Sequence, residues 1–79
     1  MGNAKEIYMG ESVYKVIELV GTSSDSWEKA AAAAVAKAAE SIRDMRVAEV
    51  SEMDMVLKDG NIEAFRTKIR VSFKIHGDD

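Results

Sequence analysis

The amino-acid sequence predicts an α+β domain whose elements follow in the order strand, helix, strand, strand. Segments 13–20, 46–57 and 62–75 are rich in β-branched and aromatic residues or alternate between apolar and polar positions, as strands do. Segment 26–44 instead repeats its apolar residues with the 3.6-residue period of a helix. The turn sequence Lys58-Asp59-Gly60-Asn61 predicts that the last two strands form an antiparallel hairpin.

The first strand, residues 13–20, is apolar on both faces. We expect Gly21 to end it, since glycine weakens a strand. A strand that is apolar on both sides is normally covered on both sides, and a chain of 79 residues has little material to do so alone. We therefore expect partner subunits to cover it. The two faces consist of Val13, Ile17 and Leu19 on one side and Tyr14, Val16 and Val20 on the other.

The predicted helix, 26–44, is rich in alanine. Ser23 or Asp25 is its expected N-cap, and Asp25 with Glu28 fits a capping box. The small alanine side chains suit tight packing on a small sheet, and they also suit close helix contacts between subunits. Trp27 is expected to pack in the core rather than to form a stacking platform for a ligand. The apolar stripe consists of Trp27, Ala31, Ala34, Val35, Ala38, Ile42 and Met45.

Strand 62–75 separates an apolar face from a basic one. We expect Glu52 and Asp54 of the preceding strand to form cross-strand ion pairs with the basic side chains. The alternative is that the basic face takes phosphates or an acidic partner. The apolar face consists of Phe65, Thr67, Ile69, Val71, Phe73 and Ile75, and the other face of Ala64, Arg66, Lys68, Arg70, Ser72 and Lys74.

The composition excludes several kinds of chemistry. The chain has no Cys, which removes disulfides, thiol nucleophiles and thiolate metal sites. Its single His, His76, lies close to the end of the sequence and is a poor candidate for a catalytic base, so we expect no enzyme activity. The formal net charge of −3 argues against nucleic-acid binding. Met53 and Met55 are interpreted as core or interface residues rather than metal ligands.

Length and organisation point to a small homo-oligomer. Chains this short bury little surface and usually depend on disulfides, a metal or partner subunits for stability, and disulfides are excluded here by the absence of Cys. Residues 1–11 are interpreted as an N-terminal extension, either a flexible tail or a docking arm anchored by Ile7-Tyr8-Met9, and residues 12–79 as the domain. No stretch is long and apolar enough to span a membrane, and no signal peptide is recognisable, so the expected location is cytoplasmic.

Several strings together resemble the dodecin family. The segment Val-Tyr-Lys-Val-Ile-Glu-Leu-Val-Gly-Thr-Ser at 13–23 is similar to the first strand and helix entry of dodecins. Val-Ala-Glu-Val at 47–50 and Val-Ser-Phe-Lys-Ile at 71–75 match the segments that follow in that family, so the resemblance covers about residues 12–75. It implies a three-stranded antiparallel sheet curled around one helix, and assembly into a hollow dodecamer. It also implies a ligand: flavin-type dodecins store riboflavin or FMN between subunits, some dodecins hold coenzyme A, and one type binds calcium.

Two positions differ from the flavin-type pattern. Where those dodecins carry a Trp that stacks on the flavin ring, this chain has Val47, next to Arg46. Where they carry a Gln that bonds the ring edge, this chain has Arg66. The loss of an aromatic platform removes about 1–3 kcal/mol of stacking per ring. The chain therefore resembles the calcium-associated subgroup more closely, with weakened or lost flavin binding.

A calcium site needs hard oxygen ligands. Glu52 and Asp54, followed by Glu49, are the candidate metal ligands, because one carboxylate repeated around a symmetry axis can supply several ligands. The alternative is that these carboxylates pair with Arg66, Lys68 and Arg70. The resulting hypothesis is a non-catalytic dodecamer that binds a cation or small ligand. Two others stay open: a flavin-storing dodecin in which Arg66 contacts flavin oxygens, and an adaptor that holds a protein partner through its basic face and N-terminal extension.

Overall fold

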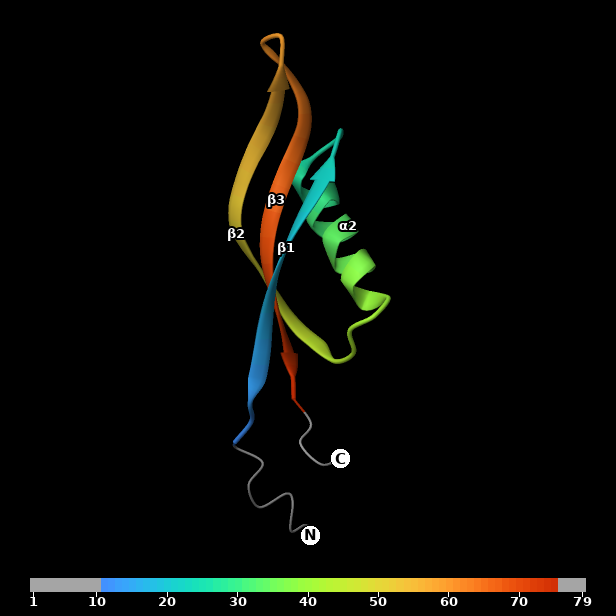
Figure 1. Ribbon diagram of the computed structural model, residues 1–79, viewed down its shortest axis with the longest axis vertical. Helices are drawn as coiled ribbons and strands as arrows, with labels where there is room; N and C mark the ends of the chain where they lie inside the picture. The colour runs from blue at the N-terminus through green and yellow to red at the C-terminus, as the bar shows by residue number, and fades with distance from the viewer. Residues whose placement is uncertain (1–10, 76–79) are drawn as a thin grey trace.

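The computed structural model describes residues 11–75, and these form a three-stranded antiparallel sheet with one helix against one of its faces (Figure 1). Strands β1 (Tyr14–Ser23), β2 (Met45–Lys58) and β3 (Asn61–Lys74) are arranged in the order β1-β3-β2, so that β3 is central. Helix α2 (Trp27–Ala39) connects β1 to β2. The predicted fold class and element order are therefore confirmed. Ile7-Tyr8-Met9, the anchor of an N-terminal extension expected to be either a tail or a docking arm, lie outside the described residues. So does His76, which was interpreted as a poor candidate for a catalytic base.

The core lies between helix α2 and strands β1 and β3. Ala30, Ala34 and Ala38 are the buried residues of the helix, spaced four apart as one face of a helix requires. They face three buried residues of β3, namely Thr67, Ile69 and Val71. Ile17 and Leu19 of β1 pack against the same cluster, which confirms most of the core positions predicted for the strands. In the helix, Ala34 and Ala38 were predicted, whereas the fully buried Ala30 was not. The short alanine side chains allow the helix to approach the sheet closely.

Strand β1 continues past its predicted end. Gly21 pairs with Thr67, and the strand reaches Ser23. Glycine is needed here because the helix crosses directly above it: a Cβ at Gly21 would lie 1.9 Å from the carbonyl oxygen of Ala30. The expectation that Gly21 breaks the strand was wrong, since its missing side chain makes room for the helix rather than ending the sheet.

Helix α2 is shorter than predicted and has a different cap. Its N-cap is Ser26, whose side chain accepts a hydrogen bond from the backbone N–H of Lys29. Ser23 instead accepts from the backbone N–H of Asp25, so neither predicted cap residue occupies the N-cap position. The helix ends at Ala39, not at 44. Asp44 adopts a left-handed backbone conformation with φ of 59°, which turns the chain into β2.

The hairpin turn is confirmed. Asp59 and Gly60 both have positive φ, 52° and 78°, as the two central residues of a type I′ turn require. The hairpin extends beyond both the end of β1 and the helix (Figure 1).

Candidate functional site

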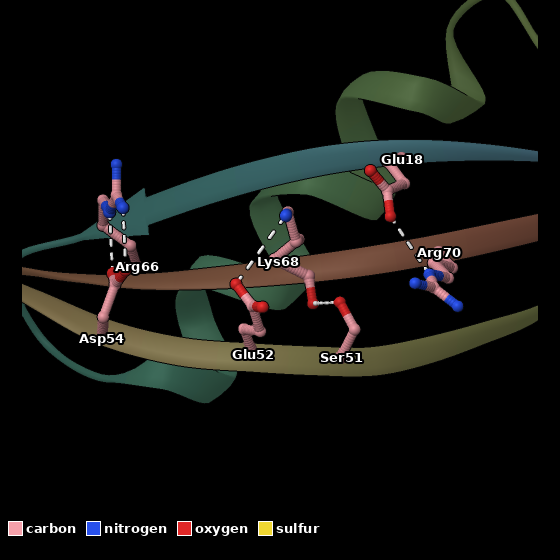
Figure 2. A network of polar contacts seen from close by, with 7 residues as sticks. All are labelled: Glu18, Ser51, Glu52, Asp54, Arg66, Lys68 and Arg70. Atoms are coloured by element: carbon pink, nitrogen blue, oxygen red, sulfur yellow. Dashed lines mark hydrogen bonds and ion pairs between the residues drawn. The ribbon is translucent and has the colours of Figure 1, made fainter.

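The candidate site lies on the face of the sheet opposite helix α2. Residues paired across an antiparallel sheet share a face, and Thr67, Ile69 and Val71 point towards the helix. The residues that alternate with them on β3, Arg66, Lys68 and Arg70, therefore point away from it. Figure 2 shows these side chains on the near side of the sheet, with the helix behind the strands. We call this surface the outer face.

A β-bulge brings all three predicted carboxylates to the outer face. Strict alternation would place Glu49 and Glu52 on opposite sides of β2, because they are an odd number of residues apart. The register shift between Val50 and Glu52 adds one residue, so that Glu49 pairs with Arg70, Glu52 with Lys68 and Asp54 with Arg66. At the shift, the Ser51 hydroxyl donates to the carbonyl oxygen of Lys68 at 3.2 Å.

Asp54 and Arg66 form the strongest pair of the outer face. Arg66 Nε and a terminal guanidinium nitrogen each donate to one carboxylate oxygen of Asp54, both at 2.7 Å. This two-point geometry is the favoured way in which Arg recognises a carboxylate. The hydrogen bonds from Arg66 hold the pKa of the Asp54 carboxyl below its ordinary value. They raise the pKa of Arg66 in turn.

The neighbouring carboxylates are paired more loosely. Glu52 lies 3.7 Å from the Lys68 ammonium, and Glu18 of β1 accepts a hydrogen bond from Arg70 Nε at 3.1 Å (Figure 2). Arg70, which the register places opposite Glu49, is thus paired with Glu18 instead, and Glu49 forms no ion pair within residues 11–75. The expectation of cross-strand ion pairs is confirmed. The participation of Glu18 was not anticipated, because the strand order β1-β3-β2 cannot be read from β1 alone.

Within one subunit these carboxylates do not form a cation site. Asp54 and Glu49 pair with β3 residues that are four positions apart, so the two carboxylate-bearing residues are separated by about 13 Å along the strand. The ligands of a Ca²⁺ ion, in contrast, all lie within about 2.6 Å of the ion. No group of three or more acidic or His side chains is close enough to hold a metal ion in the described part of the chain. A small hollow of about 80 Å³ does lie beside them, lined by Val20, Glu52, Asp54, Arg66 and Lys68.

The positions predicted for a flavin site lie in two places. Val47 pairs with Ser72, so it is six residues along β3 from Arg66, or about 20 Å. Arg46 is the extra residue of another β2 bulge, and it lies 3.9 Å from Asp44. Arg46 and Val47 line a separate groove of about 190 Å³, together with Val35, Met45, Ala48 and Val71. One subunit therefore does not bring Arg66 together with the other two residues.

Trp27 is a packing residue, as predicted, but it also contacts the strand that carries Asp54. Its indole N–H donates to the carbonyl oxygen of Asp54 at 3.0 Å. Its ring meets Phe65 edge to face, with centroids 4.9 Å apart. The Thr67 hydroxyl donates to the carbonyl oxygen of Trp27 at 2.9 Å. The sequence pattern gave no signal for the contact with β2.

No helix within residues 11–75 has the length and apolar character needed to cross a membrane.

Comparison with known proteins gives a consistent match. The family model described as Dodecin matches residues 13–76. The calcium dodecin of Mycobacterium tuberculosis is 52% identical over 64 residues, which are 81% of this chain and 90% of that protein. The dodecin of Thermus thermophilus is 33% identical over 63 residues, covering 80% of this chain and 91% of that protein.

Solved structures agree. A crystal structure of the M. tuberculosis protein, described as calcium chelating and as having a novel calcium-binding site, superposes with a TM-score of 0.73 at 51% identity, covering 86% of this chain and 97% of that one. A dodecin from Streptomyces coelicolor superposes with a TM-score of 0.81 at 27% identity, covering 89% of this chain and 100% of that one.

Proposed function

This chain belongs to the dodecin family, and on that premise we propose that it is a binding protein that assembles into a dodecamer and holds a divalent cation, with calcium as the first candidate. The observation that carries the proposal is the 52% identity to calcium dodecin across 90% of that protein. The assembly places copies of the outer face around symmetry axes. One carboxylate from each of several subunits then supplies the six to eight oxygen ligands that Ca²⁺ takes.

The carboxylates of the outer face differ in how free they are to bind a cation. Asp54 has both oxygens engaged by Arg66. Glu52 has a single contact with Lys68 at 3.7 Å, while Glu49 forms no ion pair within residues 11–75. A cation must displace existing partners before a carboxylate can ligate it, so the proposed order of contribution is Glu49, then Glu52, then Asp54. The sequence alone placed Glu52 and Asp54 ahead of Glu49.

Calorimetric titration of the metal-stripped full chain with CaCl₂ tests the proposal. We expect saturable binding that is weakened most by Glu49→Gln and less by Glu52→Gln. Glu63→Gln is the matched control, because Glu63 is an exposed carboxylate near the hairpin turn, away from the outer-face pairs. MgCl₂ is the control ion, since Mg²⁺ demands a stricter octahedral geometry. The absence of saturable Ca²⁺ binding, or equal losses in all three variants, would contradict the proposal.

The same protein sample distinguishes a flavin carrier. Val47 is 58% exposed and offers no aromatic ring to stack on a flavin, and the guanidinium of Arg66 is already bound to Asp54. We therefore expect that micromolar protein leaves FMN and riboflavin fluorescence unquenched. Val47→Trp should then restore quenching by supplying a stacking platform. Strong quenching by the unmodified chain would favour flavin storage instead.

A further inference from the structure

Trp27 makes three contacts with the residues around the Asp54–Arg66 pair, and it makes them from the opposite side of the sheet. Its indole N–H donates to the carbonyl oxygen of Asp54 at 3.0 Å. On β3, the two neighbours of Arg66 also contact Trp27. The Phe65 ring packs edge to face against the Trp27 ring, and the Thr67 hydroxyl donates to the Trp27 carbonyl oxygen. A single residue at the start of helix α2 therefore contacts both strands that carry the pair: the backbone of β2 at Asp54, and the side chains of β3 on either side of Arg66.

This bracing matters because of where β2 lies. β2 is an edge strand, so its backbone is hydrogen-bonded to a neighbouring strand on one side only, towards β3. The helix packs mainly on β1 and β3, and the hydrogen bond from Trp27 is a contact that it makes with β2. The two-point pair needs both of its oxygen–nitrogen distances to be kept at 2.7 Å, which depends on the relative position of the two strands.

We propose that Trp27 is a positioning residue for the Asp54–Arg66 pair: by contacting the Asp54 backbone and the side chains on either side of Arg66 from the helix side of the sheet, it keeps Asp54 paired with Arg66. Two consequences follow. First, breaking the ion pair changes the environment of Trp27 on the other face of the sheet. Second, removing the hydrogen bond from Trp27 makes the Asp54 carboxylate more available to bind a cation. The second consequence rests on the proposed cation binding, whereas the first does not.

The first experiment observes Trp27 directly. The chain has one Trp, so incorporation of 5-fluorotryptophan gives a single ¹⁹F resonance that can be followed in the intact assembly. We expect Arg66→Gln to shift or broaden this resonance, because it breaks the pair that shares a backbone with the indole contact. Arg70→Gln is the matched control, since Arg70 pairs with Glu18 on the same face, and it should leave the resonance unchanged. An unchanged resonance in Arg66→Gln, or equal shifts in both variants, would overturn the proposal.

The second experiment measures cation binding. Trp27→Phe keeps an aromatic ring next to Phe65 and removes the indole N–H donor, together with part of the ring. Loss of one such hydrogen bond corresponds to about a threefold to tenfold change in an equilibrium constant, and we expect Ca²⁺ to bind more tightly by that factor. The gain in Ca²⁺ affinity should vanish in the double variant that also carries Asp54→Asn. A purely structural role of Trp27 does not predict this dependence on Asp54. If Trp27→Phe leaves Ca²⁺ affinity unchanged, or if the gain survives Asp54→Asn, the link to Asp54 is refuted. If the chain binds no Ca²⁺ while the ¹⁹F result holds, the proposed function fails and the positioning role stands.

Discussion

At the scale of single residues, the charged side chains of the outer face that could bind a ligand are largely engaged in ion pairs with one another. Asp54 and Arg66 each satisfy the other at 2.7 Å, so a cation must compete with the guanidinium and an anion must compete with the carboxylate. Both side chains stay accessible to water, and exposed ion pairs contribute little to stability on average. The pair therefore matters more for which ligand the outer face accepts than for how stable the fold is.

The pair gives a pH dependence with a definite sign. The pKa of folded Asp54 lies below its ordinary value of 3.8 because Arg66 hydrogen-bonds the charged form. A lowered folded pKa stabilises the protein above the unfolded pKa, and the contribution is lost as the pH falls through the folded pKa. We expect Arg66→Gln to return the Asp54 pKa to near its ordinary value, as measured by NMR on carboxyl-labelled aspartate. Arg70→Gln should leave it lowered, and an equal change in both variants would show that general charge, not the hydrogen bonds, sets the pKa.

Gly21 supports a second prediction at this scale. Gly21→Ala places a Cβ where the carbonyl oxygen of Ala30 lies, so backbone has to move. We expect it to destabilise the fold by about 1–3 kcal/mol, as overpacking does, measured by urea unfolding at fixed protein concentration. Gly60→Ala is the comparison, since its Cβ meets nothing within 4 Å and only the positive φ opposes it. A loss at Gly21 no larger than that at Gly60 would contradict the close approach of helix and strand.

At the scale of elements, periodicity predicted the strands and helix but not the irregularities that shape the site. The buried residues Thr67, Ile69 and Val71 follow simple alternation and were predicted. The bulge beside Ser51 was not, because a single inserted residue leaves no compositional signal in a strand that is mostly exposed. The end of the helix at Ala39 was missed for a related reason: the apolar pattern continues through Ile42 and Met45, although these lie beyond the helix.

The cap of helix α2 gives a prediction for this scale. Ser26 accepts a hydrogen bond from the backbone N–H of Lys29, one of the donors that a helix start leaves without a partner. We expect Ser26→Ala to lower the free energy of unfolding by about 1 kcal/mol, measured by denaturant titration. Ser24→Ala, two residues earlier at an exposed position, should stay within about 0.5 kcal/mol of the unmodified chain. Equal losses in the two variants would contradict a specific capping role of Ser26.

At the scale of the whole molecule, one subunit leaves much of its apolar surface uncovered. The helix packs on β1 and β3, while Val50, Met53 and Met55 of β2 stay exposed. Val50 pairs with the buried Ile69, and Met53 pairs with the buried Thr67. The exposed fractions of Val50, Met53 and Met55 are 51%, 58% and 44%, and monomeric proteins rarely leave such patches open. The sequence predicted the need for partners from length and from the apolar first strand, whose Tyr14, Val16 and Val20 are exposed in the subunit. It did not show that the apolar side chains of β2 are left exposed as well.

Native mass spectrometry of the purified chain tests assembly through this surface. We expect the unmodified protein to be a dodecamer. Met53→Glu should shift it to smaller species, because burying a Met side chain contributes about 1.5–3 kcal/mol per subunit and an unpaired buried carboxylate opposes association. Met53→Leu keeps the position apolar and should leave the dodecamer intact. A dodecamer that survives Met53→Glu would place the interface elsewhere on the subunit. A monomeric unmodified chain would contradict the assembly itself, and with it the idea that symmetry-related carboxylates complete the cation site.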